Sequence, residues 1–214
     1  VSAHIVANVF LELLPQFGRN PSEQVKALQQ LIEAFYSRNR VASRMEGRLT
    51  LDRIRTMSSW PKLKAKAAAV RNLVPFAAEL AAQYNSGSLH DKRRLALAND
   101  LNEFYTLLGN EGRFFSASAL ASVQRLGNSV PILYAHLAAE AFHSGTKAWK
   151  LVPKFLLYQH LCLYQAAFHG YIRFHWTYAD EDMVGAMVEV AQSCHPSTMA
   201  PIAMFKWLVL QFQQ

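Results

Sequence analysis

Apolar residues recur along this chain at the three- and four-residue spacing of helices that bury one face. The spacing is clear at Val25, Leu28, Leu31, Ile32 and Phe35. Strand-like alternation of β-branched residues is absent from the sequence, whereas Ala, Leu and Gln, which favour helices, are abundant. The pattern therefore predicts an all-α protein, an irregular bundle of about eight to ten helices.

Polar residues ahead of the apolar runs mark where helices begin. Asn20-Pro21-Ser22-Glu23 is typical of a helix start, because Asn20 can accept a hydrogen bond at the N-cap and Pro21 fits the first helical turn. Glu23 can reach back to the same end of the helix. The run over residues 2–14 should stop at Pro15. Further caps are expected at Thr50, for a short helix through Met57, and at Ser88, Ser116 and Ser197.

Trp60-Pro61 is expected to open another helix. In a helix, Lys62, Lys64 and Lys66 could not all share one face, so at least one of them would lie along a flank. Pro75 is expected to kink this helix or to split it in two.

The later segments complete the expected bundle. A long helix from Ser116 should bend near Pro131. Residues 149–168 are very apolar and are predicted to form a central helix, and residues 180–194 a further helix that starts on three acids. We expect one helical domain over residues 1–214, which could divide into sub-lobes 1–85 and 86–214.

Basic residues are concentrated in the early third of the chain. Residues 38–71 contain ten Lys or Arg and two acids, Glu46 and Asp52, a net charge of +8, whereas the whole chain carries +7. A local basic segment is typical of a protein that binds a polyanion, most often a nucleic acid. The predicted nucleic-acid-binding residues are Arg38, Arg40, Arg44, Arg48, Arg53, Arg55, Trp60, Lys62, Lys64, Lys66 and Arg71.

Other interpretations of the basic segment stay open. Its charges could form a solvated surface that is ion-paired to acidic helices, or could face an anionic lipid surface or an acidic protein. Trp60 could stack on a base, but it could equally fill the core. If about six of the basic residues contact phosphates, the affinity for duplex DNA would fall with salt with a log–log slope near −5.

Asp180-Glu181-Asp182 is the one cluster of acids in the sequence. Acids at a helix N-terminus complement the helix dipole, which explains the cluster without catalysis. One carboxylate could instead bind a divalent cation, but neighbouring residues on a helix diverge by about 100°. The cluster cannot complete a Mg²⁺ site alone, so Glu181 and Asp182 are weak catalytic candidates.

No complete catalytic or metal-binding motif occurs in the sequence. The eight histidines form no HExxH or Cys/His array, and GxSxG and P-loop patterns are absent. Cys162 and Cys194 lack CxxC spacing and are expected to be reduced, which points to an intracellular, reducing compartment. We expect no metal, no cofactor and no membrane span. The chain also starts inside an amphipathic pattern, as a piece of a longer protein would.

Several short motifs, spread along most of the chain, carry a family resemblance. They are Trp60-Pro61-Lys62-Leu63-Lys64-Ala65-Lys66-Ala67 with Arg71, Leu73-Val74-Pro75-Phe76, Trp149-Lys150-Leu151-Val152-Pro153-Lys154, Trp176-Thr177-Tyr178-Ala179-Asp180-Glu181-Asp182 with Gly185, His195-Pro196-Ser197-Thr198 and Lys206-Trp207-Leu208. In these motifs the sequence resembles the C-terminal half of transposase-like proteins that are abundant in dinoflagellate genomes. Such proteins are similar to cut-and-paste transposases with an RNase H-like core, such as the KDZ group.

The resemblance implies a helical insertion ahead of a final catalytic acid, which would be Glu181. Two residues depart from the family pattern: Leu156 stands where similar proteins have His after Pro-Lys-x, and Met183 stands where they have an aromatic residue. The strand that carries the first two catalytic aspartates does not occur in these 214 residues. The chain by itself would therefore not assemble two-metal chemistry.

These observations lead to one functional prediction and one alternative. We expect a non-catalytic helical module, derived from a transposase-like protein, that binds nucleic acid mainly through phosphate contacts, DNA more than RNA. The alternative is a helical scaffold or interaction subunit of a larger complex, with an acidic protein as partner and the aromatic stretch 171–178 as a contact point. A nuclease-like step that uses Glu181 and Asp182 is a third hypothesis.

Overall fold

The computed structural model of the chain divides into two compact units, Val1–Ile172 and Arg173–Gln214. The structure describes residues 1–41, 43–55, 59–112, 114–170, 172, 193–195 and 202. Within these residues the regular elements are helices and none is a strand, so the predicted all-α class is confirmed for them. The expected helices over 180–194 and from Ser197 onward, the acids Glu181 and Asp182, and the aromatic stretch 171–178 lie outside the described residues, apart from Ile172 and residues 193–195 and 202.

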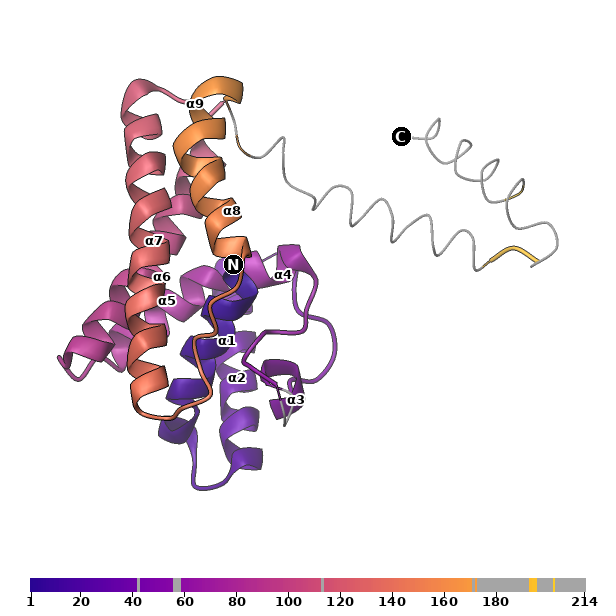
Figure 1. Ribbon diagram of the computed structural model, residues 1–214. Helices are drawn as coiled ribbons and strands as arrows, with labels where there is room; N and C mark the ends of the chain where they lie inside the picture. Colours follow the sequence, from indigo (N-terminus) through magenta and orange to yellow (C-terminus); the bar gives the residue numbers. More distant parts are fainter. Residues whose placement is uncertain are drawn as a thin grey trace. The chain divides into compact units, whose positions relative to one another are not determined.

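The first unit is a chain of helices joined by connections of very different length (Figure 1). Its elements are α1 (Ser2–Leu13), η1 (Leu14–Phe17), α2 (Pro21–Asn39), α3 (Leu51–Ile54), α4 (Ala67–Asn72), α5 (Val74–Gln83), α6 (Leu89–Asn110), α7 (Ala117–His143), α8 (Lys154–His160), the π-helical turn η2 (Leu161–Gln165) and α9 (Ala166–His169). Among the described residues seven α-helices have six or more residues, while α3 and α9 are single turns. This is fewer than the predicted eight to ten helices, because the short helix expected from Thr50 is a single turn and two expected helices fall outside the described residues.

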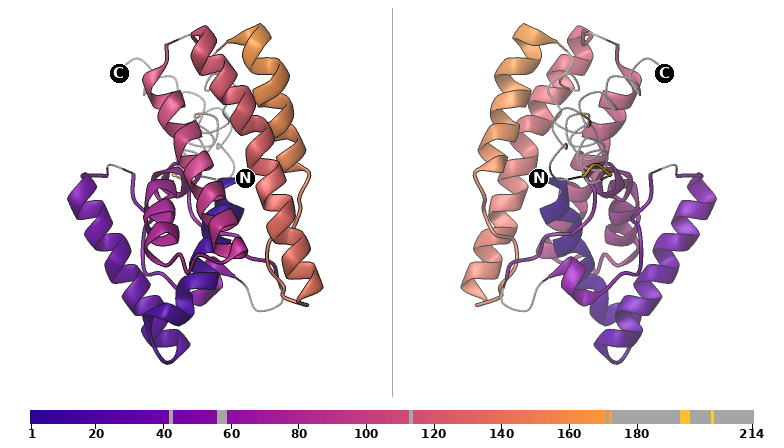
Figure 2. Two further views of the ribbon diagram at one scale, coloured as in Figure 1. Left: turned by 90° about the vertical axis from the view of Figure 1, so that its left-hand side faces the viewer. Right: turned by 90° about the vertical axis from the view of Figure 1, so that its right-hand side faces the viewer.

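Helix α1 forms the middle of the core. It contacts α3, α4, α5 and α6, and it lies between α2 and α7 in Figure 2. Ile5, Val6, Val9 and Phe10 are each at most 1% exposed, so α1 is buried on more than one face. The Phe10 ring meets Phe76 of α5 edge to face, with 5.8 Å between the ring centroids. Burial of this kind, rather than helix propensity, stabilises the short helices around it.

The four predicted N-caps that lie in the described residues are confirmed. The cap side chains of Asn20, Ser88, Ser116 and Thr50 accept hydrogen bonds from the backbone N–H three residues later, at 3.0, 3.1, 3.2 and 3.3 Å respectively. The Arg19 N–H donates to the Glu23 side chain, which therefore reaches back as expected. Pro75 lies in the first turn of α5 and separates that helix from α4. Only the end of α3 differs, since it stops at Ile54 and not at Met57.

Residues 60–66 form an extended segment, and the prediction of a helix opened by Trp60-Pro61 is wrong. Its backbone pairs with distant parts of the chain instead of with itself. The N–H groups of Lys62 and Lys64 donate to the carbonyl oxygens of Ile54 and Arg53, at 3.0 and 2.8 Å. Between them, the Leu63 N–H donates to the Ala3 carbonyl of α1, at 2.9 Å. These partners hold the segment extended between α1 and α3, which a local helix signal could not indicate.

The extended backbone corrects the expectation that the three lysines cannot share a face. Successive side chains of an extended chain point to opposite sides, so residues two apart lie together. Pro61 and Leu63 are buried, whereas Lys62, Lys64 and Lys66 are exposed. All three lysines therefore lie on the solvent side of the segment.

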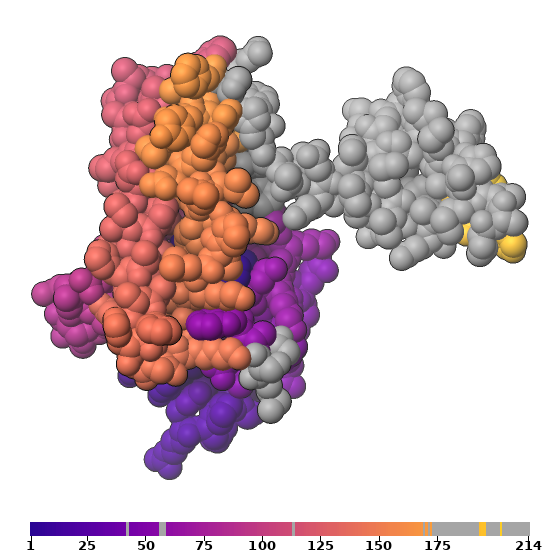
Figure 3. All heavy atoms as spheres, in the orientation of Figure 1, coloured from indigo at the N-terminus to yellow at the C-terminus, as the bar shows by residue number. Residues whose placement is uncertain are grey.

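The predicted helix over 149–168 is shorter than expected and is not central. Residues 148–153 are not helical, and α8 begins at Lys154. Trp149 has a backbone φ of 54°, which no right-handed helix tolerates, and Pro153 fits the α8 start. Helix α8 packs along α7 on one side of the unit (Figure 3). Its outer side is open to solvent, since Leu156 and Leu157 are 68% and 67% exposed.

A close contact between α7 and the π-helical turn fixes this pair. Helix α7 continues through Pro131 as one helix, and Gly127 lies one turn before that proline. A Cβ added at Gly127 would overlap the Cβ of Cys162, a buried residue of η2. Glycine is therefore needed here for space, because its φ is not in the left-handed region.

We predict that Gly127→Ala destabilises the protein by about 1–3 kcal/mol, because the added methyl group pushes α7 away from η2. Gly109→Ala is the matched control: Gly109 also lies in a helix, α6, but has open space around it. The control should be neutral or stabilising by about 0.5 kcal/mol, since alanine lowers the entropy of the unfolded chain. Urea unfolding followed by circular dichroism measures both, and equal effects of the two substitutions would contradict the prediction.

Candidate nucleic-acid interface

Three lysines from two distant parts of the chain line one hollow on the surface. Lys62 and Lys64 come from the extended segment, and Lys150 comes from the non-helical stretch ahead of α8. The hollow has a volume of about 440 Å³ and also includes His4 and Trp60 in its lining. Lys154, which begins α8, lies close enough for its charge to lower the pKa of His4 further, beyond the larger effect of burial. The site is therefore an open, positively charged concavity.

The position of Lys150 is set by its neighbour Trp149, which is 1% exposed. The Trp149 backbone N–H donates to Oδ1 of Asn8 at 2.8 Å, and its indole N–H donates to Oε1 of Glu12 at 2.5 Å. The Lys150 carbonyl accepts a hydrogen bond from the Tyr134 hydroxyl at 3.1 Å. The backbone on both sides of the Lys150 side chain is therefore held by α1 and α7.

Arg53 links the extended segment, which carries Lys62 and Lys64, to the loop before α3. Its guanidinium donates to the carbonyl oxygens of Glu46 and Arg48, at 2.5 and 3.3 Å, and its Nε donates to the Lys64 carbonyl at 3.2 Å. These donors join the loop before α3 to the extended segment. Arg53 was predicted to contact nucleic acid, but its hydrogen-bond donors serve the fold.

Three of the predicted basic residues form ion pairs with carboxylates. Arg38 meets Glu79 at 2.5 Å, Lys64 meets Asp52 at 2.8 Å, and Lys66 meets Glu46 at 3.2 Å. All six side chains are more than half exposed, and exposed pairs of this kind contribute about 0–1 kcal/mol. A phosphate could displace these carboxylates at small cost, so the pairs weaken the charge of the segment without removing it.

The other predicted residues lie around the loop that follows α2. The guanidinium of Arg44 lies over the Tyr36 ring at 5.7 Å and its Nε donates to the Val41 carbonyl. Arg40 and Arg48 are exposed, and Arg55 and Arg71 are half-buried. The structure thus brings Trp60, Lys62 and Lys64 together at the hollow, and none of the predicted arginines lines it.

Sequence reasoning missed Lys150 and Lys154, since residues 149–168 were taken for one helix. Pro153 was the cue that could have found them. A residue that precedes proline is disfavoured in the helical conformation, which argues that a helix begins after Val152. Lys150 would then have stood in a loop beside a tryptophan, where a binding residue is more plausible than in a central helix.

A second group of charged residues joins α1, α6 and α7. The His90 ring lies between two carboxylates, with Nδ1 2.6 Å from Oε2 of Glu140 and Nε2 3.0 Å from Oε2 of Glu12. The hydrogen bond with Glu12 raises the pKa of His90 to about 9, with further support from Glu140. Arg93 pairs with Glu140, and Arg94 meets Glu12 at 3.2 Å. Because cations already surround both carboxylates, this group is a clamp between helices.

The described residues contain no group of three or more His, Cys, Asp or Glu side chains placed to hold a metal ion. Burial raises the pKa of the Cys162 thiol to about 12, which keeps it from acting as a nucleophile. None of the described helices is both long and apolar enough to cross a membrane.

No family model, curated protein or solved structure matches the chain. The resemblance to transposase-like proteins therefore stays a prediction, and the proposed function depends on the geometry of the described residues.

We predict that the stability contributed by His90 is lost as the pH rises from about 6.5 to 9. The folded-state pKa of His90 is raised to about 9, above the ordinary value of 6.5, so its contribution is complete below pH 6.5 and is lost as the ring deprotonates in the folded state. Because the ring is partly exposed, we expect a loss on the order of 1 kcal/mol.

Chemical unfolding at a series of pH values measures this effect. His90→Gln should be less stable at pH 6 and should show a flatter profile over this window, because glutamine cannot carry the charge. His136→Gln, at an exposed histidine of α7, is the control and should keep the decline of the unmodified protein. A decline that persists unchanged in His90→Gln would rule out the assignment.

Proposed function

We propose that this chain is a non-catalytic helical module that binds nucleic acid mainly through its phosphates. The observation that carries the proposal is the set of lysines at one open hollow, Lys62, Lys64 and Lys150, with Lys154 beside it. Phosphate contacts by lysine need an exposed ammonium group on a supported backbone, and they need no base-specific geometry. Lys62 and Lys150 are both exposed and both emerge from backbone held by hydrogen bonds to distant residues.

Exposed arginines at the end of α2 and in the loop that follows it add to the positive charge of the chain. Arg38, Arg40, Arg44 and Arg48 are exposed, so they can add to the long-range attraction even where they have partners inside the chain. Sequence specificity should be weak, because lysines that contact phosphates do not distinguish bases. The preference for DNA over RNA, the origin from a transposase-like protein and the number of helices in the complete bundle remain parts of this proposal.

A second candidate function is an interaction subunit of a larger complex. The observation that favours it is a set of exposed apolar side chains on α7, α8 and α9, namely Ile132, Phe142, Leu156, Leu157 and Phe168. Large apolar side chains that are exposed to water are candidates for contact with another protein. None of these five side chains lines the lysine hollow, so the two functions can coexist.

We predict that the double substitution Lys62→Glu with Lys150→Glu weakens binding to a short labelled duplex DNA by about tenfold or more at low salt. If the four lysines at the hollow each contact a phosphate, the unmodified protein should show a log–log salt slope of about −3.6. The double variant should lose about two contacts, so the slope should become shallower by about 2. Fluorescence anisotropy between roughly 50 and 200 mM salt measures both quantities.

Lys26→Glu with Lys92→Glu is the matched control. It changes the net charge by the same amount, at exposed lysines of α2 and α6 outside the hollow. The control should lower the affinity less and should keep the slope. Equal losses in the two double variants would show that net charge alone attracts the DNA, and a flat salt response of the unmodified protein would refute phosphate binding.

A further inference from the structure

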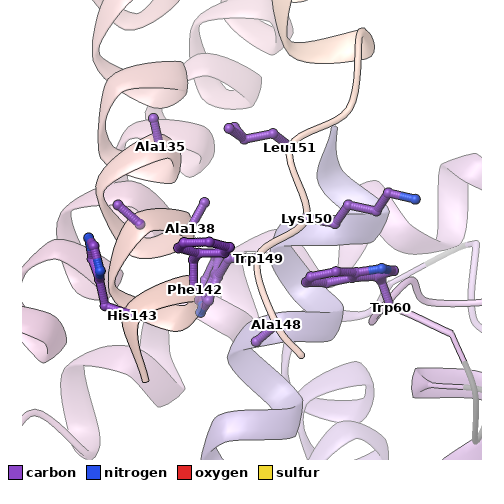
Figure 4. A pocket seen from close by; sticks show the side chains of 10 residues that line it. Trp60, Ala135, Ala138, Phe142, His143, Ala148, Trp149, Lys150 and Leu151 are labelled. Carbon is purple, nitrogen blue, oxygen red and sulfur yellow. The ribbon is translucent and has the colours of Figure 1, made fainter. Parts of the chain in front are cut away.

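Trp60 lies at the wall of two adjacent hollows of different character. One is the lysine hollow already described, and the other has a volume of about 340 Å³. Ala135, Ala138, Phe142 and Leu151 belong to the second hollow, whose walls are mostly apolar. Figure 4 shows Trp60 and Lys150 on one side of the stretch 148–151, and Ala135, Ala138 and Phe142 of α7 on the other. Lys150 also lines both hollows.

The volume of the apolar hollow falls in the range of small-ligand sites, which is roughly 300–1,000 Å³. It remains open because α7 presents alanines to it, and because Trp149 is held inward by Asn8 and Glu12. Trp60 is half-buried and lines both hollows, so a ligand in either hollow can reach it. An accessible aromatic ring beside lysines can stack on a nucleobase while the lysines bind the adjoining phosphate.

We propose that the two hollows together bind one nucleotide of a single-stranded nucleic acid, with its base against Trp60 in the apolar hollow and its phosphate at Lys62 and Lys150. The inference rests on the proposed phosphate binding and adds that the preferred nucleic acid is single-stranded. Bases in a duplex are already stacked on their neighbours and paired, so their faces cannot reach Trp60. Only an unpaired base offers a face for stacking, and the apolar hollow therefore favours single strands over duplex.

The charge pattern supports a nucleotide over a purely apolar ligand. An apolar ligand would fill the hollow beside α7 but would leave the lysines without a counterion. A nucleotide carries an aromatic ring and an anion a short distance apart, which matches a tryptophan that lines both an apolar and a basic hollow. Since stacking acts on any base, the site should bind many sequences with similar affinity.

The test compares one labelled DNA sequence as a single strand and as a duplex. Trp60→Ala should weaken binding of the single strand by about five- to 150-fold, which is the effect of losing one stacked base, and should change duplex binding by less than about twofold. Trp60→Phe should keep most of the single-strand affinity, because it retains an aromatic face. Phe168→Ala is the control for loss of an exposed aromatic residue outside the hollows, and it should change neither affinity.

A second variant closes the apolar hollow without touching Trp60. Ala139→Leu, at an exposed residue that lines this hollow, should also lower the affinity for the single strand alone. Ala121→Leu, at an exposed alanine of the same helix outside the hollow, should not. If Trp60→Ala leaves single-strand binding intact, or lowers both affinities equally, the inference is overturned while phosphate binding stands. If the unmodified protein binds neither DNA, the proposed function fails and the inference fails with it.

Discussion

Two polar side chains of α1 decide where the candidate interface lies. Asn8 is completely buried, and it accepts the Trp149 backbone N–H while its amide group donates to the His4 carbonyl at 2.7 Å. Glu12 accepts the indole N–H of the same tryptophan. Trp149 adopts a left-handed backbone conformation that an L-residue avoids unless the surroundings impose it. Loss of either partner would leave a buried polar group unpaired, so this pair of contacts ties Lys150 to the core.

The protein keeps two kinds of charge apart. Glu12, Glu140, His90 and Arg94 are partly or wholly withdrawn from water and pair with one another, which fixes α1, α6 and α7 in register. The lysines of the extended segment stand in water, where pairing with Asp52 or Glu46 is weak. Removing the clamp residues from water costs desolvation free energy, and their pairing fixes the positions of the helices. The exposed lysines can exchange one anionic partner for another, and a binding surface needs that property.

The helix starts were predictable from sequence because they depend on neighbours three residues away, as at Asn20, Ser88 and Ser116. The extended segment was not predicted, because its backbone N–H groups donate to the carbonyl oxygens of Ala3, Arg53 and Ile54. A local sequence pattern cannot indicate such partners. Even so, the alternation of Lys62, Lys64 and Lys66 with Pro61, Leu63 and Ala65 has a period of two, which argued against a helix. The lysines of the extended segment were thus identified from the sequence, whereas only the fold shows that Lys150 lies beside them.

Side chains of the extended segment alternate between core and solvent, so a change of its length by an odd number of residues moves the residues that follow to the opposite side. The segment is fixed toward α3 through Lys62 and Lys64 and toward α1 through Leu63. Deleting Ala65 would move Lys66 to the side of the segment that faces the core and Ala67 to the side that faces water. Removal or insertion of two residues would preserve the alternation. The segment should therefore tolerate only insertions or deletions of an even number of residues.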